Sequence, residues 1–199
     1  TDGAMFDAVF QSIPQILDST ALATCVDHEL GWQGIAGRDY LNGWVVPTVH
    51  SHRGMMARMS SQWCAGSDEN AHTYEHAIRA MPTRQLHITA GNSAIIPLVS
   101  LVRALASKGA AVIKSPAEVT VMSALFAMAM RAVDPKHPIT RHMSLVYWKG
   151  GDRRFEDVLF QSDAFDRIVV WGSPDTVASV RQRALDTKTI YLNPRYGLS

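Results

Sequence analysis

The sequence changes from an irregular pattern to a repeating one at Leu86-His87-Ile88-Thr89-Ala90-Gly91-Asn92, a short strand-forming run that ends in small and polar residues. Beyond it, apolar residues recur at helical spacing from Ile95 to Leu105, and a second β-branched run follows at Ala111-Val112-Ile113. A strand, a helix and a strand in this order are typical of a βαβ unit. The stretch therefore predicts parallel strands joined by a crossover helix.

The same alternation continues toward the end of the chain. Further strands are predicted at Ser144–Trp148, Arg167–Trp171 and Thr189–Leu192, and helices at Val119–Ala132, Arg153–Phe160 and Asp175–Leu185. Each strand ends in a small or polar turn, and in an open α/β sheet such turns meet at the carboxyl edge, where ligands bind. We therefore expect an α/β fold, a Rossmann-like parallel sheet of about five strands flanked by helices, with a ligand site at that edge.

Two regions are predicted along the chain. Residues 1–82 contain short helical patterns broken by glycines, which predicts a mostly helical, irregular lead-in. Residues 83–199 carry the βαβ series and are predicted to form a nucleotide-binding domain.

Composition limits the classes of function. Hydrophobic residues make up 47% of the chain and charged residues 19%, which suits a globular domain with a core. The formal net charge of +1 gives no general attraction to nucleic acid or to an anionic membrane, so no nucleic-acid partner is expected. No apolar run approaches the roughly 20 residues of a membrane span, and no leader pattern is visible. We therefore expect a cytoplasmic protein. Cys25 and Cys64 form no CxxC pair and no disulfide framework typical of secreted proteins, so both are expected to be reduced.

Four segments in order carry a resemblance to a known family: His87–Asn92, Gly109–Glu118, Tyr147–Asp152 and Val169–Ser173. They resemble the aldehyde dehydrogenase superfamily, and more closely its acyl-CoA reductase branch, typified by the bioluminescence fatty acid reductase. The likeness covers residues 85–199. It implies a reductase that converts acyl-CoA or an acyl-protein thioester to an aldehyde through a cysteine acyl-enzyme, with NADP or NAD as cofactor. A Rossmann GxGxxG is absent, in agreement with that superfamily.

The resemblance also implies that the chain is part of a larger enzyme. The family's nucleophilic cysteine follows the last strand, and neither Cys25 nor Cys64 matches it. We therefore expect a cofactor-binding portion without its C-terminal catalytic domain, inactive alone, from a protein that is a homo-oligomer at full length. Hydrolytic relatives have a glutamate near the position of Asn193. Without a carboxylate base there, water competes poorly for the thioester, which suits acyl exchange between thiols.

Individual roles follow from the same resemblance. Asn92 matches the amide that holds the oxyanion of the reacting thioester, and an N-cap of the helix near Ala94 is the alternative. Lys114 matches the lysine that meets the adenosine ribose or a 2′-phosphate. Gly172-Ser173 matches the turn that lets pyrophosphate approach backbone N–H groups, and Gly150-Gly151 matches a turn beside the adenine. Besides the catalytic Asn92, the predicted cofactor-binding residues are Thr89, Ala90, Gly91, Lys114, Ser115, Glu118 (offset by one from the family's ribose-binding acid), Gly150, Gly151, Trp171, Gly172, Ser173, Thr176 and Asn193.

Other interpretations stay open. His72-Thr73-Tyr74-Glu75-His76 matches the H-x-x-E-H pattern, which in inverted zinc peptidases puts two ligands on one helical face. A chance match on an exposed helix explains it better, because a βαβ series follows instead of a third ligand, so no metal is expected. A second alternative is a nucleotide-binding or oligomer-forming module without chemistry of its own. The methionine-rich helix Val119–Met130 is predicted to pack in the core, with a partner-facing surface as its alternative.

Overall fold

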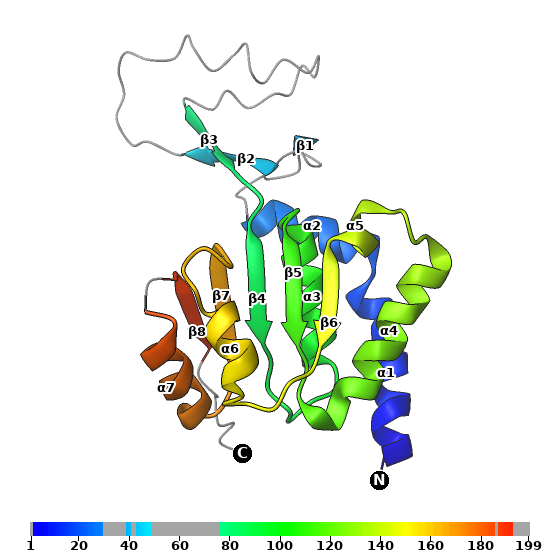
Figure 1. Ribbon diagram of the computed structural model, residues 1–199. Helices are drawn as coiled ribbons and strands as arrows, with labels where there is room; N and C mark the ends of the chain where they lie inside the picture. Colours follow the sequence, from blue (N-terminus) through cyan, green and yellow to red (C-terminus); the bar gives the residue numbers. More distant parts are fainter. Residues whose placement is uncertain (1, 30–38, 41–42, 49–75, 186, 193–199) are drawn as a thin grey trace, which may run out of the picture. The chain divides into compact units, whose positions relative to one another are not determined.

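Five parallel strands form the central sheet of the computed structural model, which describes residues 2–29, 39–40, 43–48, 76–185 and 187–192 (Figure 1). In their order across the sheet they are β6 (Met143–Val146), β5 (Ala110–Lys114), β4 (Arg84–Ile88), β7 (Arg167–Trp171) and β8 (Thr189–Leu192). All neighbouring pairs are parallel. The predicted α/β fold with a five-stranded parallel sheet is confirmed.

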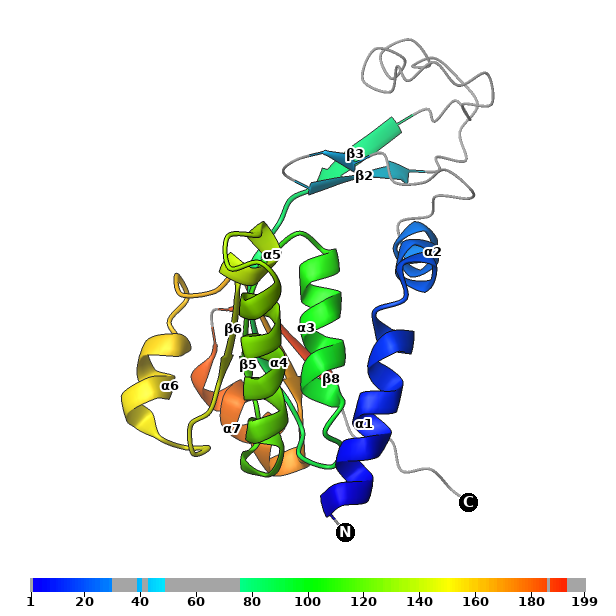
Figure 2. The same cartoon turned by 90° about the vertical axis from the view of Figure 1, so that its right-hand side faces the viewer.

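Helices join the strands and cover both faces of the sheet (Figure 2). In chain order these connections contain α3 (Ile96–Ala106), the 3-10 turn η1 (Ala117–Val119), α4 (Thr120–Val133), α5 (Pro138–Arg141), α6 (Arg153–Leu159) and α7 (Pro174–Arg183). α3 and α4 lie on one face, and α6 and α7 on the other. The sequence pattern does not predict the short α5, and β6 ends two residues before the predicted end at Trp148.

The alternation of side chains along the strands gives each face its own core. Leu86 and Ile88 of β4 join the apolar cluster on the side of α6 and α7, whereas Ala111 and Ile113 of β5 pack on the side of α3. Because successive side chains point to opposite faces, a sheet covered on both faces buries apolar residues at nearly every position. Each fully buried Leu or Ile contributes about 1.5–3 kcal/mol, so the interior of the sheet holds its strands firmly in register.

The chain reverses its direction across the sheet at β4. From β4 it runs outward to β5 and β6, returns through α6 to β7 on the other side of β4, and ends at β8. The connections after β4 and β7 therefore leave two neighbouring strands toward opposite faces, through α3 and α7. Such a topological switch point opens a crevice at the carboxyl ends of the strands.

Two compact units make up the chain, one of residues 1–18 and 82–199 and the other of residues 19–81. In the first unit, α1 (Asp2–Ile16) packs Ile13 against the cluster that contains Ala94 and Leu98. The second unit contains α2 (Ser19–Glu29) and an antiparallel sheet of β1 (Asp39–Tyr40), β2 (Gly43–Thr48) and β3 (His76–Ala80). The sequence pattern does not predict this sheet.

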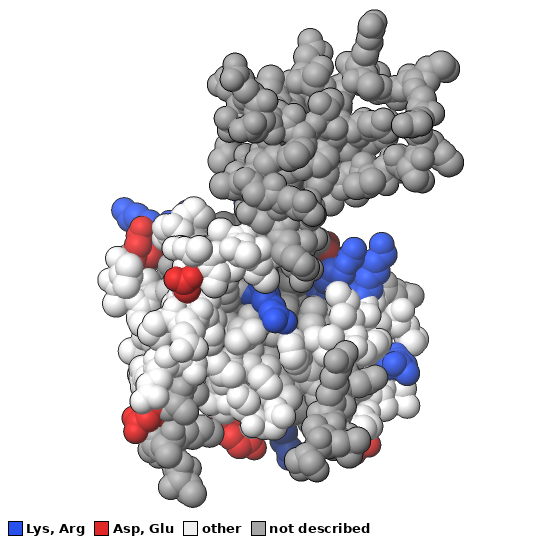
Figure 3. Space-filling model, turned by 180° about the vertical axis from the view of Figure 1, so that it is seen from behind, with Lys and Arg blue, Asp and Glu red and all other residues white. Residues whose placement is uncertain are grey.

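The methionine-rich helix α4 divides between core and surface. Met122 is buried in the cluster beside α3, with Phe126 packed against it, whereas Leu125 and Met128 are exposed, Met128 to 66%. Seen from behind, the described surface carries scattered Lys, Arg, Asp and Glu side chains with uncharged surface between them (Figure 3). The prediction that this helix packs in the core is therefore right for only one of its faces.

Of the H-x-x-E-H match, for which an exposed helix is expected, the structure describes only the last residue, His76. His76 begins β3 and pairs with Thr48 of β2. A zinc site of that pattern requires a helix that extends from the first histidine to the second. Residues 72–75 lie outside the described residues. Among the described residues, no group of three or more His, Cys, Asp or Glu side chains could hold a metal ion. Nor does any helix in this part of the chain have the length and apolar character needed to cross a membrane.

Candidate functional site

A pocket of about 1150 Å³ lies at the carboxyl ends of β4, β5, β7 and β8. The arrowheads of the parallel strands in Figure 1 point to this edge of the sheet. Its lining includes the sequence-predicted residues Thr89, Ala90, Gly91, Asn92, Lys114, Trp171, Gly172, Ser173 and Thr176, together with Ile88, Ile96, Pro116, Pro174, Tyr191 and Leu192. Four neighbouring strands thus bring residues that are far apart in sequence to one cavity at the switch point.

Two glycines line this pocket, and neither position has room for a side chain. A Cβ on Gly172 would lie 3.0 Å from both Cβ and Cγ2 of Thr176. A Cβ on Gly91 would lie 3.0 Å from Glu118 Oε2 and 3.2 Å from Cβ of Pro116. These contacts are tighter than ordinary van der Waals separations. A ligand in the pocket can therefore approach the main chain closely at both turns.

Helix α7 begins directly at the pocket. Ser173 is its N-cap, and its Oγ accepts a hydrogen bond from the backbone N–H of Thr176 at 3.3 Å. Pro174 occupies the first turn, where its missing N–H costs no helical hydrogen bond. The first N–H groups of a ten-residue helix carry partial positive charge. The start of α7 therefore suits a negatively charged group of a ligand.

Asn92 lies in the lining of the pocket and is exposed. The alternative role as a helix cap is wrong, because α3 begins at Ile96 and its N-cap position is Ile95. Residues 93–95 separate the Asn92 amide from the helix start. The side chain is therefore not used to cap α3.

Lys114 ends β5 with its amino group beside the pocket. Its Nζ lies 5.9 Å from the ring centroid of Trp148, within the range of a cation–π interaction. Burial lowers the pKa of Lys114, while the carboxylates of Glu156 and Glu118 act in the opposite direction. A half-buried ammonium with aromatic and acidic neighbours is thus held at the pocket edge.

Glu156 hydrogen-bonds Trp148, whose ring lies next to Lys114. It is buried, and its Oε1 accepts hydrogen bonds from Nε1 of Trp148 at 3.1 Å and from the backbone N–H of Gly151 at 3.0 Å. Its Oε2 accepts from Nη1 of Arg183 on α7. These bonds fix the Trp148 ring on which Lys114 lies. The sequence analysis missed Trp148, Glu156 and Arg183, and no local pattern marks them, because their significance depends on contacts between separate crossovers.

Several predicted site residues do not line the pocket. The Ser115 hydroxyl is buried and donates to Ser123 Oγ at 2.6 Å, so it faces the core. Gly150 and Gly151 form the turn after β6, where Gly151 has a φ of +83° that favours glycine. Glu118 lies against the Gly91 turn without lining the cavity. Asn193 lies outside the described residues.

Two lining residues have their own structural features. Thr89 is buried, and its Oγ1 donates to the Lys114 carbonyl oxygen at 2.9 Å, which ties the ends of β4 and β5 together. Trp171 Nε1 is buried and has no hydrogen-bond partner among the described residues. An unpaired buried donor is costly, so an acceptor from outside this part of the chain would be favourable there.

Comparison with known proteins identifies the family. The family described as Acyl-CoA reductase (LuxC) matches residues 66–193, more than half of the chain. The long-chain acyl-protein thioester reductase of Photorhabdus laumondii is 34% identical over 105 residues, which are 52% of this chain and 22% of that protein. The protein of the same name from Vibrio harveyi is 29% identical over 102 residues, 50% of this chain and 21% of that protein.

The chain thus spans about a fifth of the length of the curated relatives that it matches. The matched residues contain all five strands of the parallel sheet and all the residues that line the pocket. The chain belongs to the acyl-CoA reductase (LuxC) family.

Proposed function

We propose that this chain is the nucleotide-binding portion of an NAD(P)H-dependent reductase that converts acyl thioesters to aldehydes. The names of the relatives support a thioester as the substrate. The observation that carries the proposal is the single pocket that gathers Asn92, Lys114 and the Gly172-Ser173 turn. In the parent enzyme, a cysteine outside this chain would carry the acyl group.

The pocket residues fit a dinucleotide. Gly172 and Gly91 leave the backbone accessible, and the start of α7 favours an anion such as a pyrophosphate. The ammonium of Lys114 can donate to ribose hydroxyls or pair with a 2′-phosphate. The cofactor, when bound, supplies the hydride of the reduction.

Asn92 and Asn193 have complementary tasks in this proposal. The amide of Asn92, which does not cap α3, would donate to the oxygen on which negative charge develops. Such a donor lowers the activation barrier by about 3–4 kcal/mol. At Asn193 the chain offers an amide instead of a carboxylate base. Water near the thioester would then not be deprotonated, which favours reduction and thiol exchange over hydrolysis.

Titration of the 199-residue chain with NADPH and NADH tests the binding step. We expect quenching of tryptophan fluorescence, because Trp171 lines the pocket. Gly172→Asp should weaken binding by at least about tenfold, equivalent to about 1.4 kcal/mol, by crowding Thr176 and adding a negative charge. Ser162→Asp adds the same charge to the exposed connection before β7 and should leave binding unchanged.

Equal affinity in the Gly172→Asp variant and the unchanged chain would refute the assignment of the pocket. The chemical step needs the parent protein that contains this chain. We expect it to oxidise NAD(P)H when given a long-chain acyl thioester, with Asn92→Ala reducing kcat more than cofactor affinity. A parent protein that binds NAD(P)H but reduces no thioester would instead support the non-catalytic nucleotide-binding module.

A further inference from the structure

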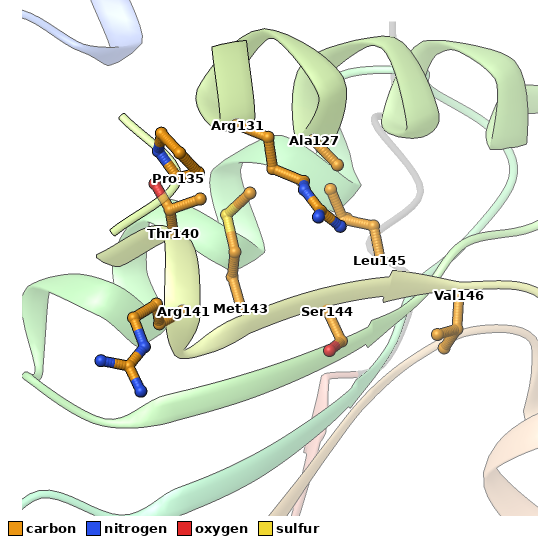
Figure 4. Close-up of a pocket in the computed structure, with 9 residues that line it drawn as sticks. All are labelled: Ala127, Arg131, Pro135, Thr140, Arg141, Met143, Ser144, Leu145 and Val146. Carbon is orange, nitrogen blue, oxygen red and sulfur yellow. The ribbon is translucent and has the colours of Figure 1, made fainter. Parts of the chain in front are cut away.

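A second cavity, of about 500 Å³, runs along β6 at the edge of the parallel sheet (Figure 4). All four residues of β6 line it, and the second half of α4 forms its wall through Ala127 and Arg131. We call it the β6 groove. Nothing in the proposed reduction uses it, since it shares no lining residue with the pocket at the switch point.

The β6 groove contains backbone groups that β5 does not use. At the two ends of the β5–β6 ladder, the N–H of Ala111 donates to the His142 carbonyl oxygen and the N–H of Ser115 donates to that of Val146, both at 2.8 Å. Alternate residues of a strand direct their N–H and C=O groups to the same side. The N–H and C=O groups of Ser144 and Val146 therefore point toward β5. Those of Met143 and Leu145 point away from it. Within the described residues, no strand pairs with that side of β6.

The groove is also positively charged. Arg131 from α4 and Arg141 from α5 line it, and no Asp or Glu is among its lining residues. Figure 4 shows the Arg131 side chain extending from α4 toward Leu145. Neither arginine makes an ion pair with another residue in the part of the chain that the structure describes. An acidic group in the groove would therefore meet an unneutralised guanidinium.

The floor of the groove adds apolar contact area. Met143, Leu145 and Val146 are each half-buried, and Ser144 between them is exposed. A ligand that matched this surface would present alternating side chains to a pleated strand and main-chain groups to a free edge. An extended peptide has both properties, and peptides are known to bind protein sheets by adding a strand.

We propose that the β6 groove binds an extended acidic peptide segment of a partner protein as an additional strand beside β6. Backbone bonds to Met143 and Leu145 provide the affinity, and carboxylates opposite Arg131 and Arg141 provide the selectivity. The charge distinguishes this occupant from a second copy of the chain, whose β6 edge would bring the same two arginines to the interface. Like charges placed opposite one another in a sheet destabilise the pairing.

Binding of short labelled peptides to the 199-residue chain tests this proposal. The probe is a fluorescein-labelled hexapeptide of alternating valine and glutamate, and the matched control peptide has lysine in place of glutamate. We expect the acidic peptide to raise fluorescence anisotropy and the basic peptide to have no effect at the same concentration. Arg131→Glu should weaken the acidic peptide by at least about tenfold and permit binding of the basic one. Arg103→Glu, an equal charge change at an exposed position of α3, should alter neither result.

Amide hydrogen exchange gives a second, independent measurement. The Ser144 and Val146 amides face β5 and should be protected already, whereas the Met143 and Leu145 amides should gain protection only with the acidic peptide. Failure of the acidic peptide to bind, or equal binding of both peptides, would overturn the proposal. So would self-association of the chain, detected by sedimentation, together with protection of Met143 and Leu145 when no peptide is present.

Discussion

Acid should destabilise the five-stranded unit through one buried imidazole. His87 on β4 is 5% exposed, and its ring nitrogens lie 3.3 Å from Ser100 Oγ and 3.0 Å from Gln85 Oε1. The Gln85 amide nitrogen already donates to Thr83 and Ser107, so its oxygen is the acceptor that faces the ring. The neutral imidazole is therefore protonated on Nε2 and accepts from Ser100 at Nδ1. Burial lowers the pKa of His87 from 6.5 to about 4.

The sign of the effect follows from linkage. The unfolded chain takes up a proton on His87 near pH 6.5, and the folded chain does so only near pH 4. The stability contributed by the neutral ring is thus fully present above about pH 6.5 and is lost as the pH falls toward 4. The difference between the two pKa values corresponds to about 3 kcal/mol, of which about 2 kcal/mol is lost by about pH 5.

Urea unfolding of the 199-residue chain at about pH 7 and about pH 5 measures this loss. The comparison is with His87→Gln, which keeps polar groups near Ser100 but does not titrate. Between the two pH values, we expect the free energy of unfolding to fall by about 2 kcal/mol more in the unchanged chain than in the variant. Titration of the other groups cancels in the difference. Equal losses in both proteins would show that His87 is not the buried neutral base described above.

Three further predictions concern single contacts. Gly109→Ala places a Cβ 2.4 Å from the carbonyl oxygen of Thr83, so it should lower the free energy of unfolding by about 1–3 kcal/mol in urea titrations; an unchanged midpoint would contradict this packing. Glu156→Ala leaves Arg183 without its buried carboxylate and should destabilise the chain by about 2–3 kcal/mol, with a changed near-ultraviolet tryptophan circular dichroism. Lys114→Met should weaken NADPH binding by about tenfold and reduce its salt dependence, as measured by fluorescence titration.

Much of the parallel sheet can be predicted from local pattern, because each of its strands is apolar and ends in a turn. The runs at 111–113, 167–171 and 189–192 fall on observed strands, and the run at 86–89 falls on β4 except for its last residue. The end of β6 is different. The apolar run continues through Tyr147 and Trp148, but Trp148 leaves the sheet and packs in the cluster beside α6, where Glu156 accepts its indole N–H. Pattern alone cannot distinguish a strand residue from a buried turn residue.

The antiparallel sheet of the second unit could not be predicted from the sequence, for a different reason. β2 and β3 pair over five residues, from Trp44 with Ala80 to Thr48 with His76. The two strands are separated by a long intervening segment, so no short turn signal links them. Their sequences contain Pro47 and Ala77, which are both unfavourable for strands. Here the pairing between distant segments, and not local propensity, determines the structure.

The same distinction applies to the pocket. Local reasoning can place Asn92, Lys114 and Gly172 at the carboxyl edge, because a parallel sheet brings the ends of its strands to one side. It cannot determine which neighbouring residues face the cavity, since Lys114 lines the pocket while the adjacent Ser115 points into the core. Nor can it identify Glu156, which reaches the site only because α6 crosses back over β4 to begin β7. Residues that line the pocket can therefore be predicted from the ends of the strands, whereas the residues that hold them in position depend on the switch in strand order itself.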